Sequence, residues 1–205
     1  MQQENVQQSI LGLLLNRRSI RRYLPEPVPH TLLETLLTAA IWAPSAHNRQ
    51  PWRFAVIEQQ AMKEKLAQAM GARLRHDLQA DGVPAVVIEK DAARSYERMT
   101  SAPVLIVLAL SMIDMDSYPD ERRSHNEYLM AVQSTAMAGQ NLLLAAHHAG
   151  LGACWMCAPL FCPDVVDETL ELPADWQPQA LLTLGYPAES REKTRKGLDA
   201  SVVWR

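Results

Sequence analysis

An unbroken apolar run at residues 102–110 limits the choice of fold more than any other part of the chain. A strand that is apolar at every position is buried on both faces, so this run predicts the centre of a covered sheet. Apolar runs at 54–57 and 180–186 predict further strands. Helical patterns lie between them without strict alternation, which favours an α+β fold arranged as a three-layer α-β-α sandwich.

The helices follow from apolar residues at helical spacing and from their end signals. Thr31 and Glu34 have the spacing of a capping box, and Asp164 is expected to cap a short helix. Glycines at 150 and 152 end a long helix that is apolar nearly all round. The segment 81–98 has no firm period and fits either a lid or a second helical hairpin. The expected helices span 6–16, 31–41, 61–78, 127–149 and 164–170.

Composition favours one folded domain over residues 1–205. The chain has 205 residues, 48% of them hydrophobic, which suffices for a full core, and we find no repeat or linker that divides it. The formal net charge of −3 gives no general attraction to nucleic acid or to an anionic membrane.

Three cysteines are too few, and odd in number, for a disulfide framework. The first residues lack the pattern of a signal peptide, and polar residues interrupt the longest charge-free run, at 128–163. We therefore expect a soluble, cytoplasmic protein.

A polar connector between Pro44 and Pro51 precedes the strand at 54–57. Proline fixes φ and removes a backbone donor, so the two prolines stiffen the connector. Its serine, asparagine and glutamine side chains offer donors and acceptors that suit the carbonyl and imide edges of a flat heterocycle. The alternative is an ordinary helix-to-strand turn.

Four arginines, Arg17, Arg18, Arg21 and Arg22, lie close together on an otherwise mildly acidic chain. Arginine offers a planar fork of donors that binds phosphate in a bidentate manner, and Ser19 adds a hydroxyl group among them. The alternative is a solvated charge run at the end of a helix, where the helix dipole favours cations.

Cys154 and Cys157 have the spacing of a redox pair or of half a zinc site. No second pair of this kind exists, and the adjacent His147 and His148 point about 100° apart on a helix. Apolar packing of free thiols is therefore favoured over a metal site.

The sequence contains no Gly-x-Ser-x-Gly motif, no P-loop and no Gly-x-Gly-x-x-Gly after a strand. A nicotinamide nucleotide would thus bind as a visiting substrate and not as the ligand of a Rossmann domain.

Three segments occur in a fixed order: Arg-Arg-Ser-Ile-Arg at 17–21, Ala-Pro-Ser-Ala-His-Asn-Arg-Gln-Pro-Trp at 43–52, and Gly-Leu-Gly-Ala-Cys-Trp-Met at 150–156. Together they resemble the FMN-dependent nitroreductase family over nearly the whole chain. The segments at 140–146 and 157–161 resemble most closely the nitroreductase-like domain fused to the coenzyme F420 glutamyl ligase. The ligase domain is missing here, which leaves the substrate open.

The resemblance implies a nitroreductase-like sandwich with a mostly antiparallel central sheet, in an intertwined homodimer with two FMN molecules at the subunit interface. The apolar patch at 202–204 would dock on the partner subunit. The backbone N–H of Cys157 would point at the flavin N5. Ala46 and Cys157 depart from residues common in the family, which could alter the shape of the substrate site. The implied FMN contacts are Arg17, Arg18, Ser19 and Arg21 near the phosphate, ribityl chain and pyrimidine edge; Lys193 and Arg195 at the phosphate; Arg98 as a basic contact; Met156, Cys157 and Ala158; and Pro44, Ser45, Ala46 and Asn48 from the other subunit.

The implied activity is that of an oxidoreductase in which NAD(P)H and a small conjugated or nitroaromatic acceptor use one flavin face in turn, by a ping-pong mechanism. A guanidinium group near the flavin N1 and C2 carbonyl would stabilise the reduced anion. No side-chain acid or base is required, which agrees with the absence of a catalytic triad. The alternatives are a specialised reductase of a deazaflavin or flavin precursor, and a non-catalytic flavin-binding protein.

Overall fold

The computed structural model describes residues 10–205, and its centre is one antiparallel sheet. The expected helix at 6–16 is present as α2 from Ile10, and residues 6–9 lie outside the described part. The strands are β1 (Trp52–Ile57), β2 (Val104–Ser111), β3 (Gly152–Met156) and β4 (Trp176–Gly185), in the spatial order β1-β2-β4-β3. The helices are α2 (Ile10–Asn16), α3 (His30–Ile41), α4 (Gln60–Ala80), α5 (Ala85–Thr100), α6 (Glu121–His148) and α7 (Pro163–Leu170), with short 3-10 turns η1 (Ala46–Asn48), η2 (Ala158–Phe161) and η3 (Leu198–Ala200).

Strand β2 is buried along its whole length, which confirms the prediction from the apolar run. Successive side chains of a strand point to opposite faces, so Ile106 and Leu108 enter one core while Leu105 and Val107 enter another. Strands β1 and β4 pair with β2 on either side, both antiparallel.

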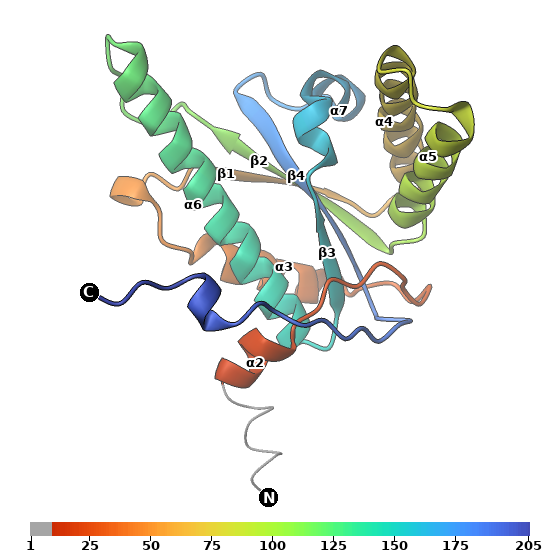
Figure 1. The fold of residues 1–205 in the computed structure, drawn as a ribbon, viewed down its shortest axis with the longest axis horizontal. Helices are drawn as coiled ribbons and strands as arrows, with labels where there is room; N and C mark the ends of the chain where they lie inside the picture. Colours follow the sequence, from red (N-terminus) through yellow and green to blue (C-terminus); the bar gives the residue numbers. More distant parts are fainter. Residues whose placement is uncertain (1–9) are drawn as a thin grey trace, which may run out of the picture.

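Helices cover both faces of this sheet, as the α-β-α prediction requires. On one face α3 and α6 supply Leu36, Ala40 and Leu142 to the core, and α6 crosses the sheet diagonally in Figure 1. On the other face α4 and α7 supply Leu66 and Val166. Among residues 10–205, no helix combines the length and the apolar character that a membrane crossing needs.

Two predicted helix starts are wrong. Helix α3 begins at His30 after Pro29, without a side-chain cap, so Thr31 lies inside the first turn and forms no capping box. Helix α7 begins at Pro163, because proline at the first helical position already has helical φ. Asp164 is therefore not the cap; it lies in the first turn and accepts hydrogen bonds from Arg73.

Helix α6 starts earlier than predicted, at Glu121, because the Asp120 side chain accepts a hydrogen bond from the Arg123 N–H at 2.9 Å. Its end is as predicted. Gly150 has φ +78°, and the N–H of Leu151 donates to the Ala146 carbonyl at 2.8 Å, which is the bond pattern of a glycine-terminated helix.

The segment 81–98 forms most of α5, which pairs with α4 as a helical hairpin, one of the two predicted alternatives. Arg75 of α4 and Glu89 of α5 join the two helices through a bidentate ion pair. Strands β1 and β4 begin at Trp52 and Trp176, before the predicted starts, and β3 was not predicted as a strand. It is a short edge strand, recognisable only from its pairing with β4.

Candidate functional site

Two segments far apart in the sequence run side by side at one end of the sheet, next to β3. The Ile20 N–H donates to the Ala153 carbonyl at 3.1 Å, and the Leu24 N–H donates to the Tyr186 carbonyl at 2.9 Å. In Figure 1 the chain that follows α2 and the chain that follows β4 meet below the sheet. The arginines of both segments are thereby brought to one place.

Several arginines lie near enough to act electrostatically on the thiol of Cys154, which is buried on β3. Burial raises the pKa of this thiol, while the positive charges of Arg21, Arg98, Arg17 and Arg191 act to lower it. The four guanidinium groups come from three parts of the chain: the segment after α2, helix α5, and the stretch that follows β4 (residues 186–205), which we call the tail. We call these four residues the arginine cluster.

Arg17 lies among other cations and forms no ion pair with any of residues 10–205. Burial lowers the pKa of Arg17, and the nearby charges of Arg195 and Arg18 lower it further. Like charges repel, so gathering them without an acid favours an anion that would bind between them.

Arg18 is turned back towards the end of α2, where its Nη1 donates to the Leu15 carbonyl at 2.6 Å and to the Arg17 carbonyl at 3.0 Å. Its Nε is buried and has no hydrogen-bond partner among the described residues. An unsatisfied buried donor is costly, so this nitrogen is available to an acceptor.

Glu189 ties the tail to the segment after α2. Its Oε1 accepts from the Arg21 N–H at 2.7 Å, and its Oε2 accepts from Arg191 at 2.8 Å. The hydrogen bond from Arg191 lowers the pKa of this carboxyl group. Arg191 is not among the contacts predicted from the sequence, and its hydrogen bond to Glu189 reveals its place.

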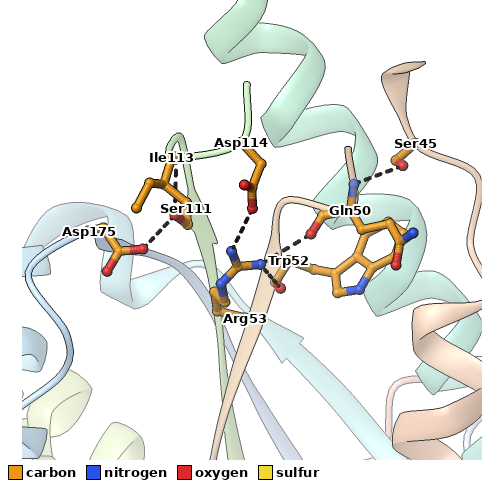
Figure 2. Close-up of polar contacts among 8 residues, drawn as sticks. All are labelled: Ser45, Gln50, Trp52, Arg53, Ser111, Ile113, Asp114 and Asp175. Carbon is orange, nitrogen blue, oxygen red and sulfur yellow. Dashed lines mark hydrogen bonds and ion pairs between the residues drawn. The ribbon is translucent and has the colours of Figure 1, made fainter. Parts of the chain in front are cut away.

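The loop at 44–50 is strained and firmly held. His47, Asn48 and Gln50 have φ of 49°, 54° and 51°, values that residues other than glycine rarely adopt. The Gln50 N–H donates to Ser45 Oγ at 3.1 Å, as Figure 2 shows, and the Ala46 N–H donates to Ser134 Oγ of α6 at 3.2 Å. Such strain persists only where the surroundings impose it, and it is common at functional sites.

Arg53 fixes the exit of this loop into β1. Its Nη1 donates to the Gln50 carbonyl at 3.1 Å and to the Trp52 carbonyl at 2.9 Å, and its Nη2 lies 3.4 Å from Asp114 (Figure 2). On the next strand, the buried Ser111 hydroxyl donates to Asp175 at 2.5 Å. The Arg53 contacts tie the end of the connector to the start of β1, in agreement with the stiffness that the two prolines predict.

The arginine cluster and this loop lie at opposite ends of the sheet. Trp52 pairs with Leu110 at one end of β2, whereas Val104 at the other end pairs with Leu184, next to Ala153. The eight residues of β2, at about 3.3 Å each, separate the two ends by about 25 Å. The structure therefore does not bring Pro44, Ser45, Ala46 and Asn48 to the arginine cluster within one chain.

The segment 154–158 is partly a strand, although no strand is predicted there from the sequence. Cys154 to Met156 belong to β3, and Cys157 follows as an exposed residue that leads into η2. The Trp155 Nε1–H donates to Cys157 Sγ at 3.2 Å. Both thiols are free, and residues 10–205 contain no group of three or more histidine, cysteine, aspartate or glutamate residues able to hold a metal ion.

The remaining predicted contacts are spread over nearby elements. Ser19 is half-buried and pairs with Ala153 through its backbone. Arg195 is exposed and lies near Arg17, and Lys193 is exposed in the tail. The remaining predicted FMN contacts, at the end of β3 and the start of η2, are Met156, Cys157 and Ala158.

Comparison with known proteins assigns the class of the chain. The model of the nitroreductase family matches residues 14–186. A Thermus thermophilus NADH dehydrogenase is 34% identical, with 93% of each chain covered. A Desulfovibrio desulfuricans protein, described as a nitroreductase and crystallised in complex with FMN, is 28% identical with a TM-score of 0.73, over 95% of each chain. A BluB-like flavoprotein from Clostridium difficile shares the fold, with a TM-score of 0.79 at 20% identity, over 96% of this chain and 99% of that one.

These matches place the chain in a class of oxidoreductases. It belongs to the nitroreductase family.

Proposed function

We propose that this protein is an FMN-dependent oxidoreductase that uses NAD(P)H to reduce a small conjugated or nitroaromatic acceptor. One observation carries the proposal: Arg17, Arg18 and Arg195 gather at one place, and Arg17 has no acidic partner among residues 10–205. A phosphate group is the anion that arginine forks bind best. The family and the FMN-bound relative support the choice of FMN.

The residues present fit this cofactor. The buried, unpartnered Nε of Arg18 and the guanidinium group of Arg17 can both donate to phosphate oxygens. Arg21 and Arg98 lie together near Cys154 and would face the pyrimidine edge. The proposed contacts from one chain are Arg17, Arg18, Ser19, Arg21, Arg98, Met156, Cys157, Ala158, Lys193 and Arg195.

The separation across the sheet supports a homodimer. The loop with Pro44, Ser45, Ala46 and Asn48 and the arginine cluster lie at opposite ends of β2, a strand about 25 Å long, which disfavours contact of both with one isoalloxazine ring within a single chain. In a two-fold dimer the loop of the partner subunit can meet the arginine cluster of the first, and the reverse. Each subunit would thus complete the site of the other.

When bound, FMN supplies the redox chemistry, by taking hydride from the nicotinamide and passing electrons to the acceptor. The protein supplies position and charge. Arg21 and Arg98 would place positive charge where negative charge develops, and Arg21 is held by a hydrogen bond from its Nη1 to the Ser19 carbonyl at 3.3 Å. Cys157 follows directly on β3, so the pairing of β3 with β4 fixes where its backbone N–H lies.

The first experiment is an absorbance spectrum of the purified protein, before and after anaerobic NADH and NADPH. We expect flavin bands that bleach with at least one donor. A flavin that neither donor reduces would favour a non-catalytic flavin-binding protein. A protein that stays colourless after incubation with FMN would refute the proposal.

Because donor and acceptor would share one face, we expect ping-pong kinetics. Double-reciprocal plots at several fixed acceptor concentrations should give parallel lines, and intersecting lines would refute the shared site.

The likeness of residues 140–146 and 157–161 to the domain fused to the F420 ligase supports a second substrate class. Turnover of a deazaflavin precursor, with little activity on nitroaromatics, would favour that specialised reductase.

A further inference from the structure

A cavity of about 390 Å³ opens beside the arginine cluster. Its walls come from three elements: the segment after α2 with Arg21 and Arg22, helix α5 with Arg94 and Arg98, and the tail with Arg191. Below α5 in Figure 1, the chain that follows α2 and the chain that follows β4 come together. The volume lies in the range of small-molecule pockets.

The lining has an excess of positive charge. Two of its arginines are paired: Arg94 with Asp91 at 2.6 Å, and Arg191 with Glu189 at 2.8 Å. The other three, Arg21, Arg22 and Arg98, form no ion pair with any of residues 10–205.

The pKa of Arg98 agrees with this excess of positive charge in the cavity lining. Burial lowers its pKa, and the charges of Arg21, Arg94 and Arg191 lower it further. Glu97 is the acid among the lining residues, and it lines the cavity together with these cations. An anion in the cavity would relieve the repulsion between the guanidinium groups.

The proposed flavin contacts use only part of this lining. Arg21 and Arg98 are assigned to the pyrimidine edge, whereas Arg22 and Arg94 have no role in holding the cofactor. Arg94 and Arg98 are one helical turn apart on α5, so their side chains share a face. Arg22 and Arg94 thus extend the positive surface of the cavity beyond Arg21 and Arg98, the two residues assigned to the pyrimidine edge of the flavin.

We propose that this cavity binds an anionic group of a substrate that reacts at the flavin, through Arg22 and Arg94. The inference rests on the proposed function. The group is a phosphate of the nicotinamide donor or a carboxylate of the acceptor, since both are recognised by the same guanidinium chemistry. Either group would orient its substrate on the flavin face, so the protein prefers substrates that carry negative charge.

The test compares wild type with Arg22→Ala and Arg94→Ala, and with Arg122→Ala as control. Arg122 is an exposed arginine on α6, outside the cavity lining. The probe is inorganic pyrophosphate, titrated by calorimetry into FMN-loaded protein, in which the phosphate contacts at Arg17 are already filled. We expect each cavity variant to weaken pyrophosphate binding by about tenfold or more, and the control to bind as wild type does.

Steady-state kinetics distinguish the two sources of the anion. If the donor phosphate binds, Arg94→Ala raises KM for NADH or NADPH and leaves the acceptors unchanged. If an acceptor carboxylate binds, Arg94→Ala raises KM for 4-nitrobenzoate but not for nitrobenzene. Arg94→Lys, which keeps the charge, should restore part of the affinity.

Wild type that does not bind pyrophosphate, or cavity variants that bind it as wild type does, would overturn the inference. An Arg94→Ala variant with the same change in KM for the nicotinamide donor, for 4-nitrobenzoate and for nitrobenzene would overturn it as well. Flavin content is measured separately for each variant. Loss of flavin from wild type reports failure of the proposed function, whereas normal flavin with unchanged pyrophosphate binding reports failure of this inference alone.

Discussion

At the scale of single residues, the protein depends on arginines held close together, several of which have no acidic partner among residues 10–205. Arg17 is half-buried next to Arg195, and burial with like charge lowers its pKa. Such an arrangement is unfavourable for the free protein, and an anionic ligand would compensate for it. The cofactor therefore should contribute to the stability of this region.

Replacing Arg17 by alanine should weaken the retention of FMN. A hydrogen bond to a charged group contributes about 1.5–3 kcal/mol, so the affinity should fall by about tenfold or more. Flavin content after extensive dialysis, measured by absorbance, checks this. Arg122→Ala on α6 is the matched control and should keep its flavin. Full occupancy in Arg17→Ala would remove Arg17 from the proposed site.

Some of these residues could be recognised from the sequence, and others could not. The four arginines near residue 20 are conspicuous because they are clustered in an acidic chain. Arg94 and Arg191 look like ordinary surface cations, on a helix and in the tail. Their importance depends on α5 and the tail meeting at one cavity, and sequence spacing does not contain that information.

At the scale of elements, the packing of α6 on the sheet depends on a glycine. A Cβ atom at Gly139 would lie 2.3 Å from the ring of Trp155 on β3 and 2.9 Å from Leu108 on β2. The ring of Trp155 and the side chain of Leu108 therefore pack directly on the backbone of α6 at Gly139, and Trp155 in turn donates to Cys157 at the candidate site.

Gly139→Ala should thus lower the free energy of unfolding by about 1–3 kcal/mol through overpacking. Gly71→Ala on α4 makes the same change where the new Cβ would meet only the end of the Arg75 side chain, at 3.3 Å. Alanine is the better helix former, so this variant should gain up to about 1 kcal/mol. Urea unfolding midpoints measure the change in stability of each variant. If both variants gain stability, or both lose it, the packing argument is wrong.

At the scale of the whole molecule, the proposed site is divided between the ends of the sheet, and the tail presents an apolar patch. Trp204 is 85% exposed in the single chain, next to the exposed Val203. A contiguous apolar tail of this kind is expected to be covered by a partner. A second copy of the chain would cover it and complete the flavin site at once.

Light scattering should therefore give twice the chain mass of 23.0 kDa. Trp204→Asp should shift the protein towards monomer and release FMN in parallel. Val86→Asp, at a similarly exposed apolar residue on α5, should leave the mass and the flavin unchanged. A monomer that retains full flavin would contradict the shared site.

The sequence by itself determined the layers of this protein. A strand apolar at every position must be covered on both sides, so the central β2 and its two helical layers follow from local pattern and burial alone. Gly150 likewise ends α6 by its own conformational freedom.

Only the tertiary structure decided the rest. The strand character of β3 depends on its pairing with β4, and the arginine-lined cavity depends on three distant segments meeting at one end of the sheet. The distance between this cavity and the loop at 44–50 is likewise a property of strand register. Local sequence encodes which residues are apolar or charged, whereas long-range pairing sets which of them meet.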